Sequence, residues 1–119
     1  MNLKYFTLSE FDSPDQKGSG SLMDRNLLLQ LDTIRENYGR PIRITSGYRT
    51  AEHNAKVGGV EFSSHTKGRA VDIACTSSQE RHDLLKHIFA AGIHRVGIAN
   101  TFIHIDNDPD KPAGCVWTY

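Results

Sequence analysis

The sequence predicts a single α+β domain with a small, mainly antiparallel sheet and flanking helices. Helix-like and strand-like segments follow one another irregularly along its 119 residues, rather than as regular strand–helix–strand units. Two strand-like segments, 95–98 and 102–106, are separated by a short turn at Ala99-Asn100, as in an antiparallel hairpin. The sequence shows no internal repeat and no long linker, so residues 1–119 are expected to form one domain.

Three helices are expected, each beginning at a residue type that caps helices. Apolar residues recur at helical spacing from Met23 to Ile34, and Ser21 can cap the start of that helix. Thr50 can cap a short second helix, and a serine at 77 or 78 can begin a third. The residues that end the long helices are Gly39, Pro41 and Gly92.

Strand alternation predicts which polar side chains leave the core. Successive residues of a strand point to opposite faces of the sheet. Asp72 lies between two aliphatic residues, so it is expected on the face away from the core. His104 also lies between two isoleucines, and Asp106 shares its face. The expected strands are 41–45, 69–74, 95–98 and 102–106.

Composition excludes several classes of function. Fourteen basic and fourteen acidic side chains cancel, so the chain lacks the basic character typical of nucleic-acid binding. No run of about 18 apolar residues predicts a membrane span, and Met1 to Asp12 does not resemble a secretory signal. Cys75 and Cys115 lack metal-site spacing and are expected to be unpaired thiols. Trp117 is expected to close the core together with Tyr119.

Three residues of metal-ligand type are placed where they could converge. His65 lies in a loop rich in glycine and serine, just before the strand that carries Asp72. If that strand neighbours the strand of His104, all three side chains can meet on one face. Two imidazoles and one carboxylate are a common ligand set for catalytic zinc, which leaves a fourth position for water. Such a site is suited to hydrolysis of an amide.

Four segments of the chain carry motifs in a fixed order. They read Thr-Ser-Gly-Tyr-Arg at 45–49, Asn-Ala-Lys-Val-Gly-Gly at 54–59, Ser-Ser-His-Thr-Lys-Gly-Arg-Ala-Val-Asp-Ile at 63–73 and Phe-Ile-His-Ile-Asp at 102–106. The third resembles the first zinc motif, Ser-x-His-x-x-Gly-x-Ala-x-Asp, of the D-Ala-D-Ala carboxypeptidase family of metallopeptidases. The others resemble the flanking segments and the second zinc motif of that family.

The resemblance implies both a fold and a set of roles. It implies a fold whose metal-site geometry is shared with lysostaphin-type and hedgehog-type domains. It implies that His65, Asp72 and His104 bind one Zn²⁺ ion. Arg49 matches the family arginine that contacts the scissile peptide or its carboxylate, a role that suits a guanidinium. Ser64 is a candidate hydrogen-bond donor to the substrate or to a metal ligand.

The general base is where the chain departs from the family pattern. Many members have a glutamate or aspartate three residues before the last zinc histidine, and Thr101 stands there. Asp106 is the nearest carboxylate, and it could accept the proton of the attacking water. Alternatively, Asp106 could accept a hydrogen bond from a metal-binding imidazole and so fix its orientation. The sequence leaves both roles open.

By this resemblance the expected function is zinc-dependent hydrolysis of a peptide bond in the stem peptides of bacterial peptidoglycan. The enzyme would be a carboxypeptidase or endopeptidase acting on the cell wall or in the periplasm, as a monomer. Without a recognisable signal, release by another route or a phage-encoded origin, as in a phage-type lysin, is expected. The alternative is a metal-stabilised binding module of the same fold that has lost catalysis, which the threonine at position 101 keeps open.

Overall fold

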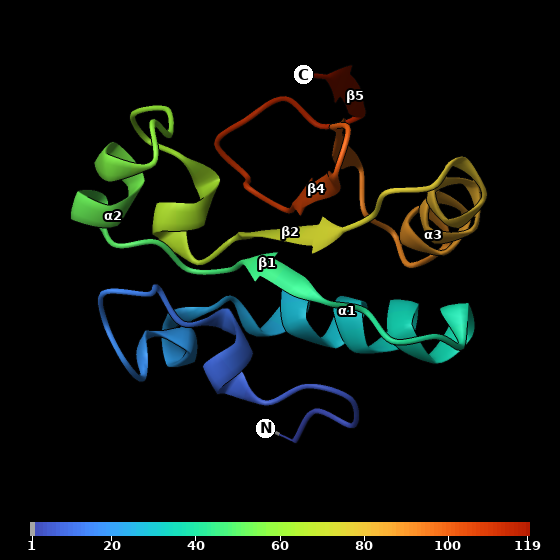
Figure 1. The fold of residues 1–119 in the computed structure, drawn as a ribbon, viewed down its shortest axis with the longest axis horizontal. Coiled ribbons are helices and arrows are strands. Elements are labelled where there is room, and N and C mark those ends of the chain that lie inside the picture. Colours follow the sequence, from blue (N-terminus) through green and yellow to red (C-terminus); the bar gives the residue numbers. More distant parts are fainter. Residues whose placement is uncertain (1) are drawn as a thin grey trace.

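The computed structural model describes residues 2–119, which form a five-stranded sheet. Helices pack against this sheet (Figure 1). The two long helices, α1 and α3, pack against each other and share one hydrophobic core with the sheet. The helices are α1 (Arg25–Tyr38), α2 (Ala51–Lys56) and α3 (Ser78–Ala90). The strands are β1 (Ile44–Ser46), β2 (Ala70–Ala74), β3 (Arg95–Ile98), β4 (Phe102–Asp106) and β5 (Cys115–Thr118).

The sheet has the strand order β1-β2-β4-β3-β5. Every neighbouring pair is antiparallel except β3 and β5, which run parallel. The predicted α+β class with a mainly antiparallel sheet is therefore confirmed, as are the bounds of β3 and β4. The strand β5 was not predicted, because its four residues do not show the alternation of apolar and polar side chains that marks a half-buried strand.

Side-chain caps fix where the helices begin. Thr50 caps α2 as predicted, and Ser77 caps α3 by accepting the backbone N–H of Glu80. The predicted cap of α1 is wrong, because Ser21 lies in a separate 3₁₀ turn. Asp24 caps α1 instead, with a carboxylate oxygen 3.0 Å from the backbone nitrogen of Leu27. These caps satisfy backbone N–H groups that the helices leave without a partner.

Alternation along the central strands separates the core from a polar face. Val71, Ile73, Ile103 and Ile105 are at most 1 % exposed and pack into the core beneath the sheet. The residues between them point to the other face, as the sequence predicted. We call this other face the polar face. It carries Asp72 on β2, His104 and Asp106 on β4, and Arg95 on β3.

The expectation that Trp117 and Tyr119 close the core is wrong. The strand β5 adds to the free edge of β3, in register Gly97↔Trp117, and this puts Trp117 on the polar face. Tyr119 follows the strand and is 65 % exposed. Neither residue reaches the core, because the long helices and the central strands already fill it. Both instead border the cleft described below.

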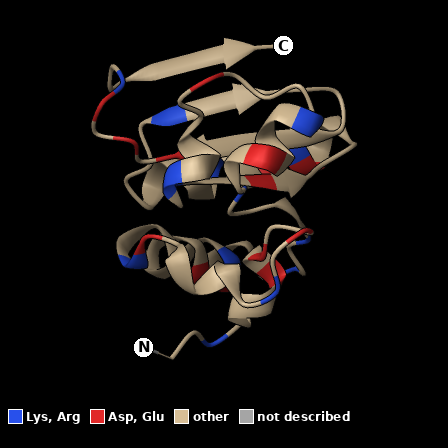
Figure 2. Cartoon of the chain, turned by 90° about the vertical axis from the view of Figure 1, so that its left-hand side faces the viewer, with Lys and Arg blue, Asp and Glu red and all other residues tan. Residues whose placement is uncertain are grey.

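Charged residues of both signs are interspersed over the fold, whereas β5 carries none (Figure 2). This distribution agrees with the balanced composition, because neither sign dominates the helices or the sheet. Cys75 is buried and Cys115 is half-buried, and both are free thiols as expected. Among the helices within residues 2–119, none has the length and apolar character needed to cross a membrane.

Candidate metal centre

His65 reaches the polar face from a short turn. Ser64–Lys67 form a single 3₁₀ turn, whose start is capped by the Ser63 side chain and whose end is the left-handed Gly68, at φ 70°. A left-handed residue of this kind favours glycine, which explains the glycine in the motif. The imidazole Nδ1 of His65 lies 2.8 Å from the carbonyl oxygen of Gly47. This contact turns the other ring nitrogen, Nε2, towards Asp72.

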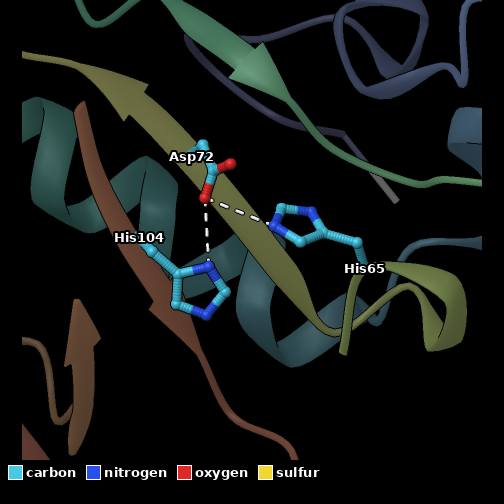
Figure 3. Close-up of side chains that lie close together, drawn as sticks. All are labelled: His65, Asp72 and His104. Atoms are coloured by element: carbon cyan, nitrogen blue, oxygen red, sulfur yellow. Dashed lines mark hydrogen bonds and ion pairs between the residues drawn. The ribbon is translucent and has the colours of Figure 1, made fainter. Parts of the chain in front are cut away.

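Asp72 and His104 lie directly opposite each other on neighbouring antiparallel strands. Oδ1 of Asp72 is 3.0 Å from Nδ1 of His104 and 3.3 Å from Nε2 of His65, so it lies between the two rings (Figure 3). One ligand-type atom from each of the three side chains lies within 4.8 Å of the others, and all three residues are buried. The structure thus brings together the three residues expected to bind metal.

The geometry and chemistry of these atoms fit a divalent ion. Ligands held 2.0–2.1 Å from a tetrahedral zinc ion lie about 3.3–3.4 Å apart, close to the two separations from Asp72. The outer nitrogen of each imidazole faces an oxygen acceptor, the Gly47 carbonyl for His65 and the Asp106 carboxylate for His104. An imidazole that donates its outer N–H presents a lone pair on its inner nitrogen. When both outer N–H groups donate in this way, two lone pairs and a carboxylate face one point, and a cation placed there satisfies all three.

A second carboxylate, that of Asp106, contacts His104 on the side away from Asp72. Oδ2 of Asp106 is 2.7 Å from the outer nitrogen Nε2 of His104, and its Oδ1 accepts from Nε of Arg95 at 2.8 Å. The backbone N–H of Asp108 donates to the same Oδ1 at 3.2 Å. Asp106 is 1 % exposed, and protein nitrogen atoms contact both oxygens of its carboxylate. This is the arrangement that fixes the orientation of metal-binding imidazoles in proteins.

The electrostatics of the cluster favour a positive charge between these carboxylates. Burial alone would raise the pKa of Asp72, but hydrogen bonds from His104 and His65 hold it well below its usual range. Burial alone would lower the pKa of His104, but its contacts with Asp106 and Asp72 raise it. The two carboxylates therefore stabilise a cation next to His104, whether that cation is a proton or a metal ion.

Arg49 and Ser64, the two other predicted site residues, both border the same cleft. The Arg49 guanidinium lies beside the metal cluster, with Nη2 3.5 Å from Oδ2 of Asp72. Its Nε donates to the Ser46 hydroxyl at 3.0 Å, and its Nη1 donates to Oδ1 of Asn54 at 3.2 Å. The Ser64 hydroxyl donates to the buried carboxylate of Asp108 at 2.8 Å, so its proton is already engaged.

An open cleft of about 610 Å³ lies over the metal cluster. Its lining includes the loop Val57–Val60 and the aromatic residues Trp117 and Tyr119. Sequence reasoning missed Arg95, Asn54 and Trp117 as parts of this site. Strand alternation could have placed Arg95 in this site. Its neighbour Val96 faces the core, so Arg95 lies on the other face, together with Asp106.

A buried His–Asp–His cluster in an open cleft is the kind of site that metal-dependent hydrolases use. The model of one protein family, Peptidase M15, matches residues 4–106 of this chain. The chain therefore belongs to the M15 family of D-Ala-D-Ala carboxypeptidase-like metallopeptidases, as the sequence motifs indicated. No curated protein matches the chain. All three candidate metal ligands and Arg49 lie within the matched segment, whereas β5 follows it.

Proposed function

We propose that this protein is a zinc-dependent peptidase that hydrolyses a peptide bond in the stem peptides of bacterial peptidoglycan. One observation carries the proposal: His65, Asp72 and His104 converge on one point of an open cleft in a chain of the M15 family. The donor set of two imidazole nitrogens and one carboxylate oxygen suits Zn²⁺ better than the oxygen-preferring Mg²⁺ or Ca²⁺.

Each ligand has its own support in the fold. His65 is held by the Gly47 carbonyl, and Asp72 and His104 by their pairing across β2 and β4. When bound, a zinc ion supplies a Lewis acid that polarises the scissile carbonyl and lowers the pKa of water. The chain itself keeps the ligand set in place, because all three side chains are buried and each has a fixed partner.

Arg49 is suited to hold the substrate next to the metal ligands. Its guanidinium is fixed on three sides by Ser46, Asn54 and Asp72, so little side-chain entropy is lost when it binds a substrate. A fixed guanidinium can hold a substrate carbonyl or carboxylate and stabilise the negative charge that develops on the carbonyl oxygen. This role fits the position of Arg49 in the lining of the cleft.

Asp106 acts by orienting His104 rather than as the general base. Its Oδ2 contacts the outer nitrogen of the imidazole, whereas Asp72 contacts the inner one. A carboxylate in that position keeps the proton on Nε2 and leaves Nδ1 free for the metal ion. Its Oδ1 accepts from Arg95 and Asp108, its Oδ2 faces His104, and the side chain is buried, so it has little capacity left to accept a proton from water.

The family and the open shape of the cleft support the proposed substrate. A cleft of about 610 Å³ over the cluster can admit an extended peptide. We place the reaction at the cell wall or in the periplasm, with the protein acting as a monomer and a phage-type lysin as one setting. Cleavage at the C-terminus and cleavage within the stem peptide both fit this proposal.

The test is digestion of purified peptidoglycan with the zinc-loaded protein, followed by mass spectrometry of the fragments. Release of D-alanine or of shortened stem peptides is expected, and the mass of each fragment identifies the bond. The same release should stop with a chelator and in a His65→Ala variant. Unchanged cleavage in that variant would show that the activity has another source.

A metal-stabilised binding module is the second candidate, and the site of Thr101 favours it. Thr101 occupies the position where many relatives have an acidic residue, it is exposed, and its backbone carbonyl accepts from the N–H of Cys75. A threonine cannot take a proton from water at neutral pH. For this candidate, the zinc-loaded protein should sediment with peptidoglycan and leave every stem peptide intact.

A further inference from the structure

Trp117 lies against the metal cluster on the polar face. Its indole ring is 5.5 Å from the His104 ring, centroid to centroid, at an angle of 52°. The close approach depends on Gly97, which pairs with His104 on one side and with Trp117 on the other. A Cβ atom at position 97 would lie only 2.5 Å from Nε1 of Trp117. Glycine at this position therefore makes room for the indole.

Arg95 joins the same indole to the hydrogen bonds of Asp106. The guanidinium carbon of Arg95 lies 4.9 Å from the centre of the Trp117 ring, in a cation–π contact. Its Nε donates to Asp106 at 2.8 Å, and its Nη1 donates to the backbone carbonyl of Pro112. Arg95 is thus held by the segment after β4 on one side and by the carboxylate that contacts His104 on the other.

These contacts form a closed ring of four side chains: His104, Asp106, Arg95 and Trp117. Three of the contacts are polar or cation–π, and the fourth is the packing of the indole beside the imidazole. Within the ring, Asp106 fixes the edge of the imidazole and Trp117 limits its rotation. The strand β5, which carries Trp117, lies beyond the segment that matches the M15 family model.

We infer that Trp117 is a positioning residue of the metal centre, which holds the His104 imidazole and the Arg95–Asp106 pair in the orientation needed for tight metal binding. This inference rests on the proposed metal site. Without the indole, the imidazole gains freedom to turn and Arg95 loses one of its contacts. Changes to groups behind metal ligands typically weaken metal binding about 10–100-fold. We expect the lower part of this range, about tenfold, because Trp117 acts through packing.

The experiment compares metal binding in the full-length chain and three variants of this contact. Trp117→Ala removes the indole, Trp117→Phe keeps a smaller ring, and Gly97→Ala displaces the indole without deleting it. Val116→Ala is the matched control, because Val116 directly precedes Trp117 on β5 and is 57 % exposed. Zinc affinity is measured by competition with a chromophoric chelator, and the visible absorption spectrum of the cobalt(II) form reports the ligand geometry. Circular dichroism establishes that each variant is folded.

The expected result is about tenfold weaker zinc binding and an altered cobalt spectrum for Trp117→Ala and Gly97→Ala. Trp117→Phe should lie closer to the parent protein, and Val116→Ala should equal it. Folded Trp117→Ala and Gly97→Ala proteins with parental affinity and spectrum would overturn the inference. If Trp117→Ala does not fold, Gly97→Ala decides alone. Absence of metal binding by the parent protein would instead overturn the proposed function, so the two failures are distinguishable.

Discussion

Replacing Asp106 by asparagine tests how the chain prepares His104 for a metal ion. The carboxylate has two acceptor oxygens, one facing Nε2 of His104 and one shared by Arg95 and the N–H of Asp108. Asparagine has the same shape but only one acceptor and an NH₂ donor. If the amide oxygen still accepts from Arg95, the NH₂ faces Nε2 of His104. The imidazole proton then moves to Nδ1, the nitrogen that must be unprotonated to bind a metal ion. If the amide is reversed, its NH₂ faces the donors of Arg95 and Asp108.

Either orientation costs metal affinity. We expect Asp106→Asn to bind zinc about 10–100-fold more weakly, which corresponds to about 1.4–2.7 kcal/mol. Chelator competition measures the dissociation constant. Asp83→Asn is the control because Asp83 is exposed and, within residues 2–119, forms its ion pairs with Arg40 and His82 on the surface. A folded Asp106→Asn protein with the parental zinc affinity would refute the orienting role. Loss of cleavage at unchanged zinc affinity would support the role of general base instead.

Three further predictions concern the metal ligands, acid stability and the core. Single His65→Ala and Asp72→Ala variants should lose stoichiometric zinc by elemental analysis, and retained zinc in both would contradict the site. For Asp108, burial alone would raise the pKa, but hydrogen bonds from Ser64, a backbone N–H and Lys67 lower it from 3.8 to about 2, worth ~2 kcal/mol of stability. Because the folded pKa is depressed, this contribution is complete above about pH 4 and is lost as pH falls towards 2. In urea unfolding, the stability lost by Asp108→Asn should shrink over that range, and a constant difference would contradict the assignment. Ile105→Ala, at a fully buried position of β4, should lower the free energy of unfolding by about 2–5 kcal/mol, and a loss below about 1 kcal/mol would contradict the packing.

Strand alternation and helix caps, which depend on adjacent residues, were sufficient to predict the central strands of this fold and where two of its helices begin. Alternation placed Asp72 and His104 on one face because their neighbours are aliphatic and fill the core. Side-chain caps located the start of two helices, since a cap needs only a few adjacent residues. The cap of α1 was misplaced because both Ser21 and Asp24 have a side chain able to cap a helix, and tertiary contacts decide between them. The backbone N–H of Asp24 donates to the carbonyl of Gly68, which fixes the chain at that point.

The parts of the site that the sequence did not reveal depend on pairing between distant segments. Trp117 reaches the metal cluster only because β5 joins β3 in parallel, and no local pattern specifies that partner. The role of Asp106 could not be chosen from sequence, because both roles need it on the same face of β4. The side of the imidazole that it contacts is a matter of tertiary geometry.

Diffraction from a zinc-soaked crystal, recorded above and below the zinc absorption edge, locates any zinc ion held by His65, Asp72 and His104. We expect one anomalous peak between Nε2 of His65, a carboxylate oxygen of Asp72 and Nδ1 of His104, about 2.0–2.2 Å from each. Asp106 should remain hydrogen-bonded to the outer nitrogen of His104. A peak at another set of residues, or no peak with zinc in excess, would contradict the account.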